Sequence, residues 1–280
     1  MDLQYRMPTR VLLNAVSIVG QVSGLGGAVS DVVPALLPNL HIRLRGSSRY
    51  KFGAGPWLAA PSVALIGPTS AAFRVEMSAD FEMACVGLLP EGWRACVGLP
   101  CGDLADAMID AATVWPASAI ASLLDACIAA RGFAERQAIV ESFLLGAVRS
   151  RPDRDARRIG AIRQWLERPG PISLDALPGH VGLCPRQVAR LTLSAYGASP
   201  KTLAMKYRAL RAAGALTVRG PAGLADATDS YADQSHLIRD FHRFIGWTPG
   251  RFLAERQPLA RATMLGRYNA GARSYLVLCS

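Results

Sequence analysis

The sequence is poor in lysine, histidine and long apolar runs. Only Lys51, Lys201 and Lys206 are lysines among its 31 basic residues, and it contains four histidines. No stretch of about 18 uninterrupted apolar residues occurs, which argues against a membrane span. It also has no glycine-rich phosphate loop, no Ser-His-Asp motif and no convincing pair of carboxylates. The sequence therefore predicts a protein that is not an enzyme, without catalytic residues or cofactors.

The cysteines show no regular framework. The six form no CxxC pair, which suits a reducing cytoplasm better than a disulfide-stapled secreted domain. Cys96 and Cys101 could be a redox pair, and scattered buried thiols are the simpler alternative. Near the start, Arg6 and Arg10 precede the apolar run 11–20, a loose resemblance to a signal peptide. Polar residues interrupt the run, so we expect a pair of β-strands there instead.

Positive charge is concentrated in the second half of the chain. At 280 residues and 51% hydrophobic content, the chain is long enough for about two domains. Residues 1–150 hold 11 basic and 12 acidic residues, whereas residues 151–280 hold 20 and 9, a net of +11. Such an excess attracts polyanions, of which nucleic acid is the commonest. The scarcity of lysine supports an alternative, an arginine-rich surface that reflects GC-rich coding.

Two patterns of hydrophobicity follow one another. From Val11 to about Thr113, short apolar runs alternate with Gly and Pro, which predicts an antiparallel sandwich or barrel. Alanine-rich segments then predict two amphipathic helices, 118–130 and 134–148, which either pack on the β-domain or form a dimer interface. The charged stretch 149–158 is the expected linker. Beyond it we expect helices at 155–168, 173–179, 185–196, 200–215, 222–228, 233–245 and 249–256.

Two segments of the helical half repeat one plan. Residues 173–200 and 223–249 each contain a short helix, a tight turn and a second helix that carries arginine on its exposed side. Both end in Gly-x-[ST]-Pro, at 197–200 and 246–249. In each closure, Gly can adopt the left-handed conformation that caps a helix, and Ser or Thr before Pro can start the next helix.

These residues resemble the C-terminal signature of the AraC/XylS family of bacterial regulators. The matching residues are Arg190, Gly197, Ser199, Pro200, Arg208, Tyr231, Ala232, Asp233, Gln234, Ser235, His236, Arg239, Phe241, Gly246, Thr248 and Pro249. The resemblance implies two helix-turn-helix units joined by a long helix, here 200–215. It also implies a DNA-binding set on the two recognition helices: Arg186, Gln187, Arg190, Gln234, Ser235, His236 and Arg239.

A helix of this kind fits the major groove of DNA, where Arg pairs with guanine and Gln with adenine. Arg190 and Arg239 fall at equivalent places in the two units, so we expect them in successive major grooves, about one helical turn apart. The alternative for both is an exposed cation on a solvated helix. Asp233 is expected to cap its helix. Thr192 and Ser230 replace the aromatic residue and the glycine that the family usually has.

The first half has a weaker resemblance to the cupin-like domain of some of these regulators. The matches are Leu37-Pro38, Leu44 and Gly46, Ile66-Gly67, Gly87 to Pro90 and Gly98 to Pro100. Enzymatic cupins usually bind a metal through two or three His and a carboxylate, and this half has only His41, so no metal site is expected. The expected fold is α+β: a cupin-like antiparallel β-barrel with two flanking helices (1–150), an all-α DNA-binding domain (151–258) and a C-terminal tail (259–280).

The expected function is that of a sequence-specific transcription regulator, more often an activator in this family, which is gated at its N-terminal domain. Expected partners are double-stranded DNA, RNA polymerase, a small-molecule effector and a second copy of the chain in a homodimer, with no membrane. The expected location is the bacterial cytoplasm, in association with the nucleoid. The alternative is a protein-interaction regulator whose degenerate helix-turn-helix units do not bind DNA by themselves.

Overall fold

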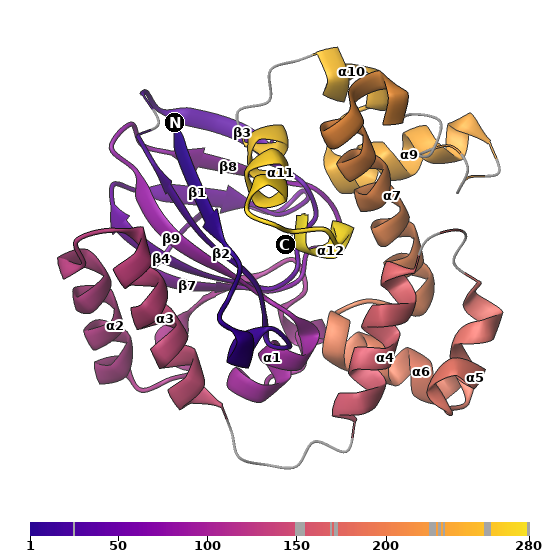
Figure 1. Ribbon diagram of the computed structural model, residues 1–280, viewed down its shortest axis with the longest axis horizontal. Coiled ribbons are helices and arrows are strands. Elements are labelled where there is room, and N and C mark those ends of the chain that lie inside the picture. Colours follow the sequence, from indigo (N-terminus) through magenta and orange to yellow (C-terminus); the bar gives the residue numbers. More distant parts are fainter. Residues whose placement is uncertain are drawn as a thin grey trace.

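The computed structural model describes residues 1–24, 26–148, 155–168, 170, 173–223, 228, 231, 233–254 and 259–278. Figure 1 shows a β-rich half beside a helical half. The fold is α+β, as predicted. None of the described helices is long and apolar enough to cross a membrane.

Within the described residues, ten antiparallel strands form two sheets. The first has the order β1 (Asp2–Arg6), β2 (Val16–Ser23), β9 (Glu82–Leu88), β4 (Asn39–Arg45), β7 (Val63–Ile66) and β10 (Met108–Asp110). The second has the order β3 (Val29–Val33), β8 (Phe73–Met77), β5 (Ser48–Lys51) and β6 (Leu58–Ala59). The prediction of a strand pair at the start is confirmed, since β1 pairs with β2.

The sheets remain open, so the prediction of a closed β-barrel is wrong. No ladder among the described residues joins one sheet to the other. Closure requires the edge strands to pair with each other, and here β6 and β10 are only two and three residues long. At the opposite edge, β1 contacts a helix. The two sheets instead pack face to face, as in the sandwich alternative.

Strand β9 shows why the first sheet is buried on both faces. Its residues alternate between two cores: Ala84, Val86 and Leu88 face the helices, whereas Met83 and Cys85 face the second sheet. This is the period-two alternation of a strand, with apolar residues on both sides.

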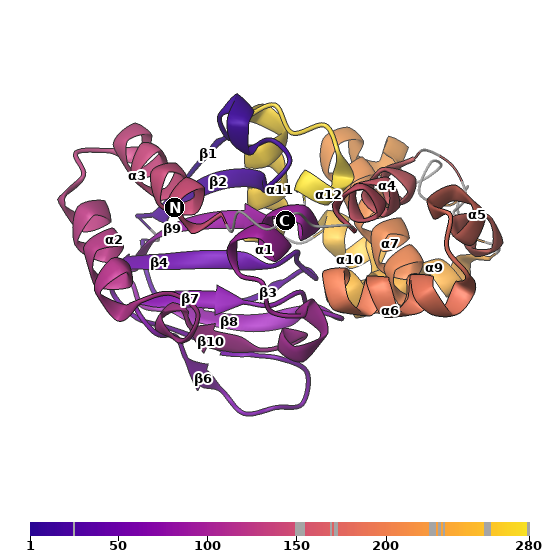
Figure 2. The same cartoon turned by 90° about the horizontal axis from the view of Figure 1, so that it is seen from below.

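Three helices cover the outer face of the first sheet (Figure 2): α1 (Pro90–Cys96), α2 (Ala117–Ala129) and α3 (Phe133–Ala147). Helices α2 and α3 follow the predicted spans closely, and they pack on the sheet through Ile120, Leu123 and Leu144. Helix α1 was not anticipated within the β-rich stretch. It begins with Pro90 and has Glu91 in its first turn, which are ordinary helix-start signals.

Both cysteines of the suggested redox pair are buried in this core. Cys96 and Cys101 are free thiols with at most 1% of their surface exposed. Cys96 Sγ donates a hydrogen bond to the carbonyl of Leu144 at 3.6 Å. Burial raises the pKa of the Cys96 thiol to about 11, so it stays protonated and unreactive. The simpler alternative, a buried structural thiol, is confirmed for both.

The helical half follows the predicted order: α4 (Ala156–Glu167), α5 (Leu177–Val181), α6 (Pro185–Tyr196), α7 (Pro200–Arg219), α9 (Gln234–Ile245) and α10 (Pro249–Ala254). Helix α7 runs four residues beyond the predicted end. It continues through Gly214, which is buried, and stops at Gly220, whose φ is 60°. Most of the expected helix 222–228 lies outside the described residues.

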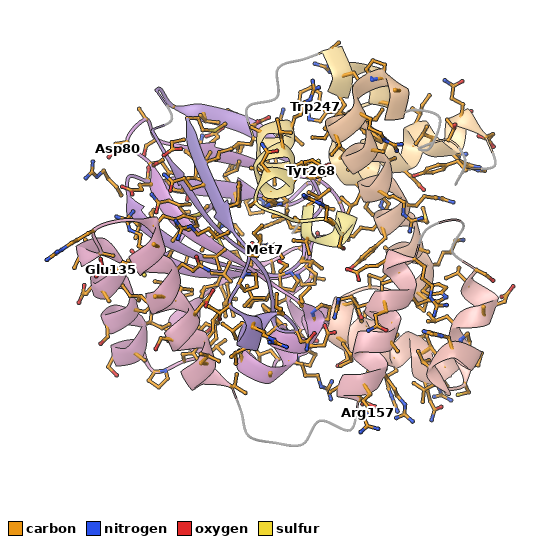
Figure 3. The ribbon with its side chains drawn as sticks, viewed as in Figure 1. Met7, Asp80, Glu135, Arg157, Trp247 and Tyr268 are labelled. Carbon is orange, nitrogen blue, oxygen red and sulfur yellow. The ribbon has the colours of Figure 1, made fainter. Side chains whose placement is uncertain are left out.

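The last segment folds back onto the β-rich half. Residues that the sequence marked only as a tail form α11 (Ala260–Asn269) and α12 (Tyr275–Leu278), and Figure 1 shows both between the strands and α7. In Figure 3, Met7 and Tyr268 lie close to this boundary. Gly266 permits the approach, because a Cβ there would lie 2.8 Å from the ring of Tyr5.

Candidate nucleic-acid interface and adjoining pocket

The first helix-turn-helix unit consists of α5, a tight turn and α6. Gly182 ends α5 in the left-handed conformation, with φ of 65°. Helix α6 begins with Pro185, and the side-chain carbonyl of Gln187 accepts a hydrogen bond from the Cys184 N–H at 3.0 Å. These local interactions set the direction in which α6 leaves the turn.

The second unit is described from α9, its predicted recognition helix, onward. Residues 224–227, 229 and 230, which include Ser230 of the expected turn, lie outside the described residues. Asp233 caps α9, as predicted: its Oδ1 accepts from the His236 N–H at 2.9 Å, and its Oδ2 lies 3.0 Å from His236 Nδ1. The backbone N–H of His236 lowers the pKa of Asp233, so the cap is a charged one.

The two closures have the predicted geometry. Gly197 and Gly246 end α6 and α9 with φ of 74° and 86°. Ser199 Oγ then accepts a hydrogen bond from the Thr202 N–H, and Thr248 Oγ1 accepts one from the Arg251 N–H. Each closure therefore starts the next helix with a hydroxyl cap before Pro. The prediction that both segments end in the same Gly-x-[ST]-Pro closure is confirmed.

All seven predicted DNA-binding side chains lie exposed on the two recognition helices: Arg186, Gln187 and Arg190 on α6, and Gln234, Ser235, His236 and Arg239 on α9. Helices α6 and α9 are each twelve residues long, and Arg190 and Arg239 are the sixth residue of each. Figure 1 shows the helices near opposite ends of α7, and in Figure 2 both follow the same lower edge of the helical half. The structure thus gathers the residues into two sets, one on each helix.

The two sets differ in how their side chains are held. Within the described part of the chain, Arg186 and Arg190 make no hydrogen bond or ion pair. By contrast, Arg239 Nε donates to the Ser235 carbonyl at 3.3 Å, and the side chain of His236 faces Asp233. Gln187 uses its carbonyl as a cap, which leaves its amide group to donate elsewhere.

An ion pair between half-buried Arg208 and buried Asp240, which the sequence analysis missed, joins α7 to α9. Arg208 Nη2 donates to Asp240 Oδ2 at 2.6 Å, and its guanidinium lies 4.1 Å from the centre of the Tyr231 ring. Asp240 is only 6% exposed. One signal was available: Asp240 follows Leu237 by three residues, on the otherwise apolar face of the helix. Arg208, matched above to the family signature, therefore positions α9 on α7.

The β-rich half contacts both closures. A Cβ on Gly197 would lie 2.4 Å from Pro68, and a Cβ on Gly246 would lie 2.3 Å from Val32. The N–H of Ala35 donates to the Phe244 carbonyl at 2.7 Å, and the N–H of Ala72 donates to the Arg243 carbonyl at 2.9 Å. The C-terminal ends of both recognition helices are thus fixed against the sheets.

Lys206 adds a buried contact between α7 and the β-rich half. The lysine is only 4% exposed. Its Nζ donates to the carbonyls of Leu36 and Thr69 at 2.5 and 2.8 Å. A charged donor that bonds two buried carbonyls makes a stronger contact than a neutral pair does. The long helix that joins the two units is therefore tied to the loops of the β-rich half.

A pocket lies between the two sheets, beside this interface. The centres of water molecules can occupy about 80 Å³ of it. A cavity of this size holds several waters or a small apolar group. His41 of β4 reaches its wall, where Nδ1 lies 3.1 Å from the Tyr50 hydroxyl. Helix α11 contributes Arg267 to the wall. In the described residues, no group of three or more His, Cys, Asp or Glu is placed to bind a metal ion.

No family model and no curated protein matches the chain in sequence. Similar solved structures include those of ToxT, an AraC-family transcription regulator of Vibrio cholerae. Apo ToxT from strain SCE256 is 11% identical with a TM-score of 0.48, over 85% of this chain and 96% of that one. Wild-type ToxT with a bound unsaturated fatty acid is 11% identical with a TM-score of 0.46, over 92% and 97%.

We expect His41 to make the protein less stable in acid. Burial, with the positive charge of Arg267 as a smaller cause, lowers the pKa of His41 from 6.5 to about 4. Because the unfolded chain binds the proton first, stability falls as the pH drops from about 6.5 towards 4, by at most about 3 kcal/mol. Denaturant unfolding at pH 7 and pH 4.5 measures this. His41→Gln should flatten the slope, whereas the exposed His180→Gln should leave it unchanged; equal slopes in all three would contradict the assignment.

Proposed function

We propose that this chain is a sequence-specific, double-stranded DNA-binding transcription regulator of the AraC/XylS type. The observation that carries the proposal is the pair of twelve-residue helices, each with an exposed arginine at its sixth position and each ended by the same capped closure. The basic excess of residues 151–280 supplies the attraction to phosphate.

In this proposal, α6 and α9 enter successive major grooves on one face of the duplex. Arg190 and Arg239 donate to O6 and N7 of guanine, and the free amide group of Gln187 donates to a base or phosphate oxygen. Because the helices differ in the rest of their exposed residues, one chain reads an asymmetric site. A small-molecule effector in the pocket gates this binding, and RNA polymerase and a second copy of the chain are further partners.

The test is binding to fragments of the source genome, followed by fluorescence anisotropy in a salt series. Arg190→Ala and Arg239→Ala should each weaken binding to the selected fragment by about 1–3 kcal/mol, roughly 5- to 150-fold, and together they should abolish it. Arg131→Ala removes an exposed arginine of the β-rich half and serves as the matched control. If no fragment binds, or if the control weakens binding equally, the proposal fails.

One observation favours a second candidate, a regulator that binds a partner protein rather than DNA. Thr192 is fully buried where the family usually has an aromatic residue, and its hydroxyl bonds back to the Ala189 carbonyl at 3.1 Å. The first unit therefore has a smaller core beneath α6. Absence of DNA binding, with a protein partner whose binding is lost in Arg190→Ala, would support this second candidate.

A further inference from the structure

The outer face of the second sheet carries basic side chains. Strands β5 and β8 alternate between the two faces of this sheet: Tyr50, Phe73 and Val75 point into the core between the sheets, so the residues between them point outward. The outward residues with a charge are Arg49, Lys51, Arg74 and Glu76. Residues 1–150 as a whole hold 11 basic and 12 acidic residues. The outer face is therefore a local positive patch in a half that has no positive excess.

Only part of this positive charge is neutralised. Arg49 Nε donates to Glu76 Oε2 at 2.5 Å, and its guanidinium lies 5.0 Å from the centre of the Trp57 ring. Lys51 and Arg74 lie directly opposite each other on β5 and β8. Their side chains make no hydrogen bond or ion pair with any residue that the structure describes. Like charges directly opposite each other in a sheet are destabilising, so a bound anion would relieve a repulsion in the free protein.

The patch adjoins the C-terminal end of α9. Val32 of β3 lies directly opposite Arg74 on the outer face, and a Cβ on Gly246 would lie 2.3 Å from Val32 Cγ1. The N–H of Ala72, two residues before Arg74, donates to a carbonyl of the last turn of α9 at 2.9 Å. Neighbouring strands are about 4.8 Å apart. Arg74 therefore lies one strand beyond the contact with α9, and Lys51 lies two strands beyond it.

Figure 2 shows that this sheet and the recognition helices share one side of the molecule. Strand β8 lies on the lower side of the β-rich half, and α6 and α9 follow the lower edge of the helical half. Arg243, in the last turn of α9, is exposed. It therefore continues the positive charge from the recognition helix to the sheet.

We propose that Lys51 and Arg74 bind backbone phosphates of the DNA that flanks the site, next to the groove that α9 enters. This inference rests on the proposed function and extends it, because the β-rich half then forms part of the DNA-binding surface. Basic side chains at phosphates add affinity through the release of counterions, and such contacts carry no sequence information. The continuity of the patch with α9 favours DNA over another polyanion, such as an anionic lipid surface.

The test measures binding of the full-length protein to its selected fragment, and to a random duplex, by fluorescence anisotropy in a salt series. In Lys51→Gln and in Arg74→Gln, the slope of log Kd against log salt concentration should fall by about 1. At about 0.15 M salt, each variant should bind both duplexes about 5-fold more weakly. Arg131→Gln removes an exposed arginine elsewhere in the β-rich half and should leave the slope and the affinity unchanged.

The length of the flanking DNA provides a second measurement. The side of the site that α9 occupies is the side whose base contacts are lost in Arg239→Ala. Removal of about one helical turn of flanking DNA on that side should weaken binding of the unaltered protein. The same removal should have no effect on a variant that combines Lys51→Gln with Arg74→Gln. Removal on the α6 side should affect neither protein.

Thermal unfolding distinguishes a binding role from a structural one. Because each substitution removes a repulsion between like charges, the Tm of Lys51→Gln and of Arg74→Gln should equal or exceed that of the unaltered protein. A lower Tm in both variants would mean that the two residues support the sheet, and it would overturn the inference. Unchanged salt slopes, or an equal effect in Arg131→Gln, would also overturn it. So would unaltered DNA binding with loss of binding to vesicles of anionic phospholipid.

Failure of the proposed function gives a different result. Binding to random duplexes alone, dependent on Lys51 and Arg74 but not on Arg190 and Arg239, would refute sequence-specific binding and leave the patch in place. Specific binding that depends on Arg190 and Arg239 but not on Lys51 and Arg74 would refute this inference alone. Absence of binding to any duplex would refute both.

Discussion

Replacing Phe241 with alanine is expected to lower the free energy of unfolding by about 3–5 kcal/mol. Phe241 is fully buried, and its ring packs edge-on against Phe252 with centroids 5.4 Å apart. Removal of the ring leaves a cavity between α7, α9 and α10 that the surrounding backbone cannot fill. The expected loss is a large part of the stability of an ordinary domain.

Chemical unfolding followed by circular dichroism measures this change, with Ile238→Ala as the matched control. Ile238 lies three residues earlier on α9 and is 39% exposed, so its truncation should change stability by less than about 1 kcal/mol. Tyr5 and Ile18 of the β-rich half belong to the same core cluster as Phe241. The loss should therefore appear in one transition shared by both halves. Two separate transitions, of which only one shifts, would contradict the shared core.

Lys206→Met should weaken the docking of α7 on the β-rich half by about 2–4 kcal/mol. The substitution keeps an unbranched side chain but removes the charged donor, so the carbonyls of Leu36 and Thr69 lose that partner in a dry interface. Among the described residues, the Leu36 carbonyl then keeps the weaker bond from the Thr69 N–H, at 3.2 Å. The loss acts on contacts between the halves rather than within either of them.

Amide hydrogen exchange distinguishes that effect from general destabilisation. The N–H groups of Ala35 and Ala72 donate across the interface to carbonyls of α9. In Lys206→Met these two amides should exchange faster, while amides of the β2–β9 ladder keep their protection. Lys201→Met, an exposed lysine on the same helix, is the control. Unchanged exchange at Ala35 and Ala72 would show that Lys206 does not hold the halves together.

These contacts bear on the proposed regulation. Both recognition helices end in a glycine that touches the β-rich half. We therefore propose that a change of the sheets would reach the helices that are proposed to enter DNA through these direct contacts. In Lys206→Met, we expect DNA binding to respond less to any effector of the β-rich half, because the sheets and the helices are then less strongly connected.

Most of the helical half could be predicted because its signals are local. The caps at Ser199 and Asp233 and the left-handed glycines at 197 and 246 depend on residues within one helical turn of each other. Helix α1 was missed because its seven residues lie between apolar runs, and so short a segment shows no clear period. The prediction of a β-barrel was wrong because the alternation of apolar and polar residues reveals which face of a strand is buried. It does not reveal whether the edge strands of two sheets pair with each other.

The sequence by itself determined that a β-rich half precedes a basic helical half, and it determined the seven exposed residues proposed to bind DNA. Periodicity, capping and charge depend on residues that are close together in the chain. The tertiary structure decided the rest. It packed residues 260–278 on β1 and β2, buried Lys206 against carbonyls 137 and 170 residues away, and set Arg267 in an apolar pocket. Such contacts join residues that are far apart in the chain, so they cannot be predicted from a local sequence pattern.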